Sequence, residues 1–344
     1  MLLSFLLRRQ ILPWLTLVLV LSGVMVHVCP WPLSRDTATA NDEMTTARAI
    51  LPTTLRGGHE LPAPADSVAM TAAVPRWDLA ERDLAALAAA QPYPVAMYIK
   101  DLRSGRVISY RDRVTMPSAS LVKLPVMVAV YRAIAAGQLT RDTRIKMLER
   151  HKVSGCGPTA GVPNGQTQTV RELLENMITI SDNTATNILV EQVGMDAVNR
   201  VCREHGLFQT DMIRDVMDLE SRDRGVENLT SARDMGQYFE MLERGEFIGH
   251  DYCAEMRAIL LRNKLRDRIP RFLPIELPIA HKTGLMYNVV HDVGTLYFPD
   301  RTVVVSVLTR DFPSYWVSKE FIGKVAQRVY QTMREFADTT RQAA

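Results

Sequence analysis

A serine and a lysine three residues apart precede an apolar run in the first half of the chain. Ser120 and Lys123 are followed by the mostly apolar residues 124–136. Pro117 is typical of a helix start, so we expect Ser120 in the first turn and Lys123 on the same face. A serine hydroxyl becomes a good nucleophile when a neighbouring base accepts its proton, and a lysine partly removed from water can be that base. The pair therefore indicates nucleophilic catalysis, although Ser-x-x-Lys also occurs in many helices as a solvated pair.

A second polar group, Ser181-Asp182-Asn183, is expected in a break between two helices. The helix before it opens with a capping box from Thr169 to Glu172 and continues with apolar residues at helical spacing. Such a break can present a hydroxyl and an amide to a cleft. The alternative is a plain helix N-cap, because Ser, Asp and Asn are all favoured there.

A third group, His281-Lys282-Thr283-Gly284, precedes the strand-like residues 289–298. At a sheet edge, the lysine and the threonine hydroxyl could bind a substrate carboxylate. The glycine would let a substrate backbone approach closely. The alternative is an ordinary surface turn that leads into a strand.

The three groups follow one another as SxxK, SDN and KTG, and together they resemble the class A β-lactamases and the penicillin-binding proteins. Each motif alone is common, but all three in this order are not. The resemblance covers residues 77–336. It implies a small-molecule β-lactam or a peptidoglycan-like substrate.

The resemblance also implies a role for each catalytic side chain. Ser120 would attack the carbonyl of a β-lactam or an acyl-D-Ala-like peptide and become acylated, and Lys123 would accept its proton. Ser181 would pass a proton to the leaving nitrogen. Asn183 would orient Lys123 and the substrate amide.

The same resemblance assigns the substrate-binding residues. Lys282 and Thr283 would hold the substrate carboxylate, and Gly284 would leave room for the substrate. Backbone N–H groups of Ser120 and Leu285 would form the oxyanion hole, where each fixed donor is worth roughly a hundredfold or more in rate.

One stretch departs from the family pattern. Class A β-lactamases have R-x-E-x-x-L-N in the loop that activates the deacylating water, and residues 214–220 here read RDVMDLE. Val216 therefore replaces the glutamate, and Glu220 replaces the asparagine. Glu220 is our candidate for the base of deacylation, and Asp218 is a weaker one. The alternative is that these acids only pair with nearby arginines at the surface.

The expected elements predict an α+β fold. Strand-like segments near both ends of the body enclose a mostly helical middle, so we expect one antiparallel sheet flanked by terminal helices, with an inserted all-helical lobe. The expected strands are 95–100, 106–110, 289–298 and 302–309, the terminal helices are 77–91 and 319–336, and the helical middle is 118–265.

The N-terminal region is expected to direct export. Arg8 and Arg9 precede the uncharged residues 11–29, which is typical of a signal peptide or of an anchor that spans the inner membrane. Residues 1–40 are therefore assigned to that signal or anchor, 41–76 to a flexible linker and 77–344 to the hydrolase domain. We expect the body to be periplasmic or otherwise extracytoplasmic.

Composition excludes several other classes. The chain has 344 residues, 47% of them hydrophobic, and a net charge of +3 without a basic cluster, so nucleic acid is not an expected partner. The four cysteines form no CxxC pair and no zinc spacing, so we expect neither metal nor cofactor. At most one disulfide could form among Cys156, Cys202 and Cys253. We expect a monomer.

Three other functions were weighed against the serine β-lactamase. A Ser-His-Asp hydrolase using His291 and Asp292 is disfavoured, because no G-x-S-x-G occurs and adjacent strand residues face opposite ways. A D-Ala-D-Ala carboxypeptidase or other penicillin-binding protein, or another amide or ester hydrolase, is favoured by Val216. A membrane-tethered sensor that binds β-lactams without turnover is disfavoured, since we expect the residues before Ile11 to be too few for a signalling domain.

Overall fold

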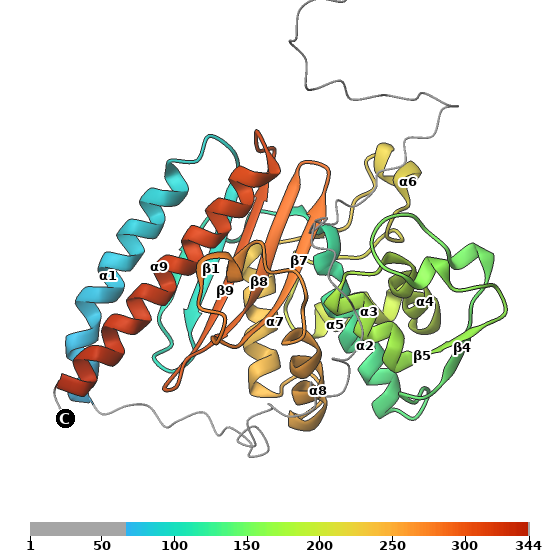
Figure 1. Ribbon diagram of the computed structural model, residues 1–344, viewed down its shortest axis with the longest axis horizontal. Helices are drawn as coiled ribbons and strands as arrows, with labels where there is room; N and C mark the ends of the chain where they lie inside the picture. Colours follow the sequence, from blue (N-terminus) through green and yellow to red (C-terminus); the bar gives the residue numbers. More distant parts are fainter. Residues whose placement is uncertain (1–66, 343–344) are drawn as a thin grey trace, which may run out of the picture. The chain divides into compact units, whose positions relative to one another are not determined.

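A five-stranded antiparallel sheet organises the protein in the computed structural model, which describes residues 67–342 (Figure 1). The strand order is β2-β1-β9-β8-β7, so the first strand of the body pairs with the last. The central strands are buried on both faces, which explains their nearly continuous runs of β-branched residues. The strands are β1 (Val95–Asp101), β2 (Val107–Tyr110), β7 (Ile279–Met286), β8 (Val289–Tyr297) and β9 (Thr302–Arg310).

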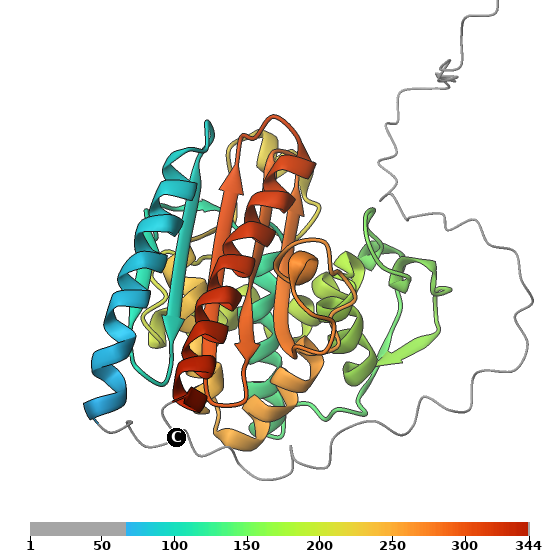
Figure 2. The same ribbon diagram turned by 60° about the vertical axis from the view of Figure 1, so that its left-hand side comes forward.

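The terminal helices α1 (Ser67–Ala89) and α9 (Tyr315–Gln342) run side by side across one face of this sheet (Figure 1, Figure 2). The ring centroids of Trp77 and Phe336 lie 6.1 Å apart where the two helices meet. Helix α1 begins at Ser67 rather than near Trp77, so residues 67–76 of the expected linker are helical. This segment contains three alanines, the residue with the highest helix propensity, and the helix continues through the single Pro75.

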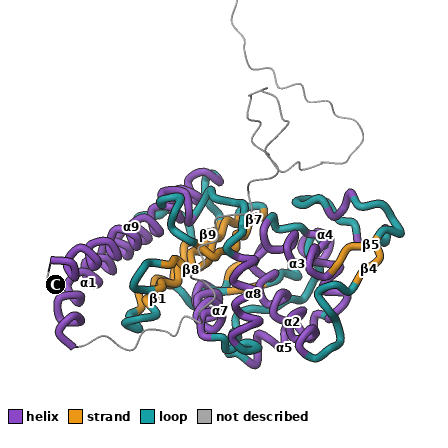
Figure 3. Tube along the Cα trace, turned by 60° about the horizontal axis from the view of Figure 1, so that its bottom comes forward, coloured by secondary structure: helices purple, strands orange, loops and turns teal. Residues whose placement is uncertain are grey.

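The opposite face of the sheet carries α7 and α8, and the remaining helices extend from there as a lobe (Figure 3). The helices of this side are α2 (Lys123–Ala135), α3 (Val170–Thr179), α4 (Asn183–Val193), α5 (Met195–Glu204), α6 (Leu219–Asp223), α7 (Ala232–Arg244) and α8 (His250–Leu260). Short 3₁₀ turns are η2 (Ala119–Val122), η3 (Glu149–His151), η4 (Thr159–Gly161) and η5 (Ile269–Phe272), and the minor strands are β3 (Met116–Pro117), β4 (Arg144–Lys146), β5 (Thr167–Thr169) and β6 (Leu229–Thr230).

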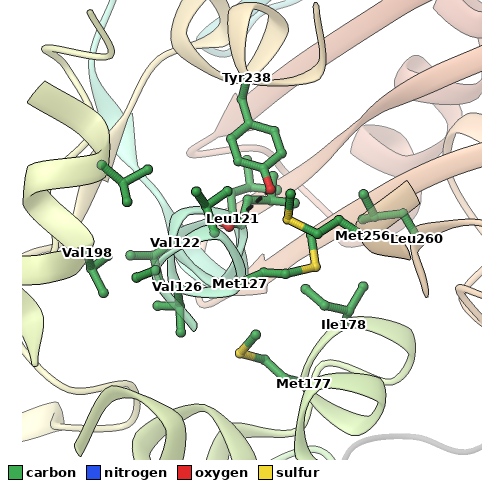
Figure 4. Close-up of a cluster of buried hydrophobic side chains, with 14 of the residues drawn as sticks. Leu121, Val122, Val126, Met127, Met177, Ile178, Val198, Tyr238, Met256 and Leu260 are labelled. Carbon is green, nitrogen blue, oxygen red and sulfur yellow. Dashed lines mark hydrogen bonds between the residues drawn. The ribbon is translucent and has the colours of Figure 1, made fainter. Parts of the chain in front are cut away.

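Helix α2 runs through the centre of the lobe and is buried along nearly its whole length. Met127 of α2 lies among Ile178 of α3 and Met256 of α8 (Figure 4). The hydroxyl of Tyr238 donates a hydrogen bond of 3.1 Å to the carbonyl oxygen of Leu124. A helix that is apolar all round must be a core helix, and this one fixes the position of Lys123 at its N-terminal end.

The arrangement confirms the predicted α+β fold with its antiparallel sheet, flanking terminal helices and inserted helical lobe. The predicted capping box is also present, since the Thr169 side chain accepts from the Glu172 N–H at 3.2 Å and Glu172 accepts from the Thr169 N–H at 2.7 Å. Within residues 67–342, the helices are too short or too polar to cross a membrane. The expected signal or anchor at 1–40 and the linker residues 41–66 lie outside the described residues.

Candidate active site

Ser120 lies in the 3₁₀ turn η2, which leads directly into α2. The backbone N–H of Lys123 donates to the carbonyl of Ser120, and residues three apart in a 3₁₀ turn lie one above the other. The preceding residue, Ala119, has a φ of 46°, an uncommon conformation for a residue other than glycine. The Ser120 side chain is partly buried. The turn therefore presents the hydroxyl at the start of a rigid, buried helix.

Lys123 is completely buried, and its amine is held by three oxygen atoms. The Nζ atom donates to the carbonyl oxygen of Ser181 at 2.7 Å, to Oδ1 of Asn183 at 2.8 Å and to Oγ of Ser181 at 3.1 Å. Burial lowers the pKa of Lys123 to about 7, and the carboxylate of Asp182 only partly opposes this effect. A large fraction of Lys123 is therefore neutral near pH 7 and can accept a proton.

Ser181 lies in the break between α3 and α4, as the sequence predicts. Its φ of 61° turns the chain sharply, and the Asp182 side chain caps α4 by accepting from the Ala185 N–H at 2.8 Å. The second Asp182 oxygen accepts from the Thr159 N–H at 2.8 Å. The N-cap and the catalytic candidates thus coexist, because Asp182 caps the helix while Ser181 and Asn183 contact Lys123.

Lys282, Thr283 and Gly284 lie within β7, the edge strand, rather than before a strand. The Nζ atom of Lys282 donates to Oγ of Ser181 at 3.0 Å and to the carbonyl of Thr283 at 2.9 Å. Burial, then the nearby charges of Lys123 and Arg268, hold the pKa of Lys282 well below its usual range. The structure therefore joins the first and third motifs through the hydroxyl of the second.

Gly284 lets β7 approach the turn that carries Ser120. A Cβ atom at this position would lie 3.1 Å from the Cβ of His291 and 3.4 Å from that of Ala119. The next residue, Leu285, is on the same edge strand and its side chain is partly exposed. The segments that were expected to supply the two oxyanion-hole N–H groups therefore lie next to each other.

Arg268 is a buried cation near Lys282 that the sequence analysis did not single out. Its side chain is 2% exposed and pairs with Asp267 at 3.1 Å. A cation here provides a positive potential beside Lys282, where an anionic substrate group is expected to bind. Arg268 stands in a run with many charged residues, 262–271, and nothing in that pattern indicates burial.

Asn187 is a second residue that the sequence analysis missed. Its amide binds both backbone groups of Val216, with Nδ2 donating to the Val216 oxygen at 3.0 Å and Oδ1 accepting from the Val216 N–H at 3.1 Å. Val216 is 8% exposed. Asn187 lies four residues after Asn183 on α4, and this helical spacing could have indicated a shared face.

The contacts of Glu220 and Asp218, the candidate acids of the loop 214–220, lie within their own loop and helix. The Glu220 side chain is 86% exposed and pairs at 2.5 Å with Arg224, the residue that follows α6. Asp218 caps α6 by accepting from the Ser221 N–H at 3.0 Å, and hydrogen bonds from Ser221 lower its pKa. In the described residues neither carboxylate hydrogen-bonds Ser120, Lys123 or Ser181. The geometry thus matches the surface-pair alternative more closely than a role of Glu220 in deacylation.

His291 and Asp292 face opposite sides of β8 and do not form a catalytic pair. His291 Nε2 lies 2.8 Å from the carbonyl of Pro117, and burial lowers the pKa of His291 to about 4. Asp292 instead lies 2.9 Å from Nδ1 of His281 and accepts from the Ile269 N–H at 2.9 Å. Both side chains support the strands around the site.

Two further features of the structure concern the sequence expectations about metal ions and disulfides. Among the described residues, no group of three or more His, Cys, Asp and Glu side chains is arranged to hold a metal ion. Cys202 and Cys253 are both buried thiols, and Cys156 is partly exposed.

The loop 153–157 packs against the SDN segment. The carbonyl of Cys156 accepts a hydrogen bond from the Asn183 N–H at 3.2 Å.

Comparison with known proteins agrees with the resemblance that the three motifs indicated. Residues 79–333 match the family described as "Beta-lactamase enzyme family". A β-lactamase of Streptomyces fradiae is 30% identical over 320 residues, which covers 88% of this chain and all of the relative.

Solved structures of a β-lactamase and of PBP-A are also similar to this chain. A β-lactamase from Sphaerobacter thermophilus DSM 20745 is 30% identical, with a TM-score of 0.69 over 74% of this chain and 96% of that one. PBP-A is 26% identical, with a TM-score of 0.70 over 75% of this chain and 96% of that one.

Proposed function

Because the chain belongs to the β-lactamase enzyme family, we propose that it is a serine hydrolase acylated at Ser120 by a β-lactam and deacylated by water. The observation that carries the proposal is the environment of Lys123. A fully buried amine with a pKa of about 7, held beside the turn that carries Ser120, is suited to remove the proton of a serine hydroxyl.

The proposed acylation uses the three motifs in sequence. Lys123 takes the proton of Ser120 while the serine oxygen attacks the lactam carbonyl. The hydroxyl of Ser181, which bridges the two lysines, then delivers a proton to the lactam nitrogen as the C–N bond breaks. Lys282 donates hydrogen bonds to the substrate carboxylate, and the buried charge of Arg268 nearby attracts that carboxylate.

Deacylation is the slower half of the proposed cycle. Glu220 remains the candidate that the sequence provides for activating water, but its exposed pairing with Arg224 gives that role no support. Since Val216 replaces the family's glutamate, we expect the acyl-enzyme to be hydrolysed more slowly than it forms.

Val216, which stands where the family has its glutamate, also favours a second candidate function, a penicillin-binding protein that acts on D-Ala-D-Ala peptides. Such an enzyme would form a long-lived adduct with a β-lactam and turn over a peptide substrate instead. Similarity to PBP-A fits this candidate as well as the first.

One experiment tests both candidates. The protein is mixed with a chromogenic β-lactam, and ring opening and protein mass are followed over time. Steady turnover supports the β-lactamase, whereas a burst equal to the enzyme concentration and a persistent adduct support the penicillin-binding protein. The Ser120→Ala variant is the control and should show neither signal; an adduct on Ser118 or Ser181 would overturn the assignment.

We also propose that the body functions outside the cytoplasm, because Arg8, Arg9 and the uncharged residues 11–29 are typical of an export segment. Fractionation of cells that express the full chain tests this. Protein in the periplasmic or membrane fraction supports export, and folded protein confined to the cytosol contradicts it.

A further inference from the structure

The ring of His291 lies between the edge strand β7 and the turn that carries Ser120. His291 is opposite Gly284 in the pairing of β7 with β8, and its side chain is completely buried. A Cβ atom at Gly284 would lie 3.2 Å from Cδ2 of His291 and 3.4 Å from the Cβ of Ala119. The ring therefore fills the space next to the two segments that are expected to form the oxyanion hole, those of Ser120 and Leu285.

Both ring nitrogens of His291 contact backbone groups. Nε2 lies 2.8 Å from the carbonyl oxygen of Pro117 in β3. Nδ1 lies 3.2 Å from the backbone nitrogen of Thr309 in β9 and 2.9 Å from the carbonyl oxygen of Val290. The Val290 oxygen already accepts from the Thr309 hydroxyl at 2.6 Å. The ring thus connects the central sheet to the segment that begins three residues before Ser120.

These contacts favour one protonation state of the ring. A carbonyl oxygen can only accept, so the Pro117 contact requires a proton on Nε2, whereas the Thr309 N–H can only donate and requires a lone pair on Nδ1. The Val290 oxygen needs no ring proton, because it has the Thr309 hydroxyl. Burial lowers the pKa of His291 to about 4, so the ring is neutral near pH 7. His291 is therefore the Nε2–H tautomer, which donates toward the nucleophile turn and accepts from the sheet.

The turn that follows Pro117 needs support from its surroundings. Ala119 has a φ of 46°, and a residue other than glycine keeps such a conformation only where the surrounding structure fixes it. The N–H of Ser118 donates to the carbonyl of Asn228 at 2.7 Å. Pro117 has no N–H, so its carbonyl is the backbone group through which a hydrogen bond can hold it. The His291 contact therefore holds the start of the turn against the sheet.

The position of this turn matters for the proposed acylation. The two expected oxyanion-hole donors come from different segments, since Ser120 lies in η2 and Leu285 in β7. Such donors must lie about 2.7–3.1 Å from the developing oxyanion, and a misplacement of about 1 Å can cost about a hundredfold in rate. His291 contacts the segment before one donor through Pro117 and lies against Gly284, which precedes the other.

We propose that His291 is a positioning residue, which sets the spacing between the oxyanion-hole N–H groups of Ser120 and Leu285 through its hydrogen bond to Pro117. His291 acts through the turn and does not touch the substrate. This role rests on the proposed function, in which Ser120 is acylated, whereas the Nε2–H tautomer does not depend on it.

Three substitutions separate the two hydrogen bonds of the ring. In His291→Gln, the side-chain NH₂ group can take the place of Nε2 and donate to Pro117. In His291→Asn, the shorter amide can take the place of Nδ1 and accept from Thr309, but Pro117 loses its donor. His291→Leu loses both hydrogen bonds. The Gln and Asn variants are a matched pair, because both carry a neutral amide.

Single-turnover acylation by a chromogenic β-lactam, normalised to the amount of folded protein, measures the effect. We expect the limiting rate of the Asn and Leu variants to fall at least about tenfold, as misplaced oxyanion donors imply. The β-lactam concentration that gives the half-maximal rate should stay within about twofold, because the bond acts mainly on the transition state. The Gln variant should stay within about threefold of wild type in rate, since the donor to Pro117 is retained.

The infrared stretching frequency of the acyl-enzyme carbonyl is a second readout. Hydrogen bonds from the oxyanion hole polarise this carbonyl and lower its frequency. The frequency should be higher in His291→Asn than in wild type and unchanged in His291→Gln. A purely structural role of His291 would lower the melting temperature and leave the rate and the frequency of the folded protein unchanged.

Histidine NMR of the wild type completes the test. A two-bond proton–nitrogen spectrum at pH 7, assigned by the signals that a variant of His291 loses, should show the Nε2–H tautomer. A proton on Nδ1 overturns the proposal, as do equal rates in the Gln and Asn variants or wild-type rates in all three variants. If the wild type is not acylated by the β-lactam, the proposed function fails. The same variants are then compared with a fluorophosphonate, whose phosphoryl oxygen enters the oxyanion hole of serine hydrolases, and absence of labelling by this reagent as well overturns the role of His291.

Discussion

The Nζ atom of Lys282 lies 3.0 Å from the Oγ atom of Ser181. The Nζ atom of Lys123 lies 3.1 Å from the same oxygen, so one hydroxyl connects the amines of two buried lysines. Burial and the charge of Lys123 both lower the pKa of Lys282. We expect the three groups to share protons, with Ser181 as the path between the base and the leaving group.

The rate of acylation should depend on the protonation of Lys123. The neutral amine is the active form, and its pKa is about 7. The single-turnover acylation rate should therefore rise with pH, about tenfold per unit below the pKa, and level off above it. Lys123→Ala should be slower by about a hundredfold or more and should lose this pH dependence. A wild-type rate that stays constant from acid to neutral pH would mean that another base acts.

Substitution of Glu220 should have little effect on either half-reaction. The side chain is exposed and pairs with Arg224, and exposed pairs of this kind contribute little. In Glu220→Gln we expect acylation and deacylation within about twofold of wild type and an unchanged melting temperature. Stopped-flow acylation and mass spectra of the decaying adduct measure the two steps. Accumulation of adduct in the variant alone would instead establish Glu220 as the base that the sequence suggested.

Substitution of Val216 by glutamate should speed deacylation. The backbone of Val216 is held to α4 by Asn187, and the family resemblance places the water-activating glutamate at this position. Val216→Glu should hydrolyse the acyl-enzyme at least about tenfold faster than wild type, as a positioned general base usually provides. Val216→Gln has a similar size but no carboxylate and is the control. Equal rates in the two variants would show that position 216 does not approach the acyl-enzyme.

Gly157 should be intolerant of a side chain, because the loop that carries it packs on the SDN segment. Its φ is 104°, and a Cβ atom would lie 2.1 Å from the carboxyl group of Asp182. Gly157→Ala should therefore lower the free energy of unfolding by about 2 kcal/mol or more. Gly161→Ala, in the same loop but with open space around its Cα, is the control and should change it by less than about 0.5 kcal/mol. Thermal denaturation of both variants checks this, and similar melting temperatures would contradict it.

The sequence by itself determined the elements and the three motifs, because both depend on local patterns. β-branched runs near both ends and helical spacing in the middle specified the sheet and the lobe, and a capping residue such as Thr169 marks a helix start through contacts within one turn. The bond between Ser181 and Lys282 was predictable only through the family resemblance, since the two residues come from segments far apart in the chain.

Only the tertiary structure decided which side chains are buried beside the site. Arg268 stands among charged residues typical of a surface, yet it is buried at the start of η5, which packs against α9. Glu220 occupies a promising position in the sequence, but the short helix α6 turns it toward Arg224. The direction and environment of such side chains depend on elements far away in the chain. The burial, the pKa and the contacts of a side chain depend on these distant neighbours. A local sequence pattern carries no information about them.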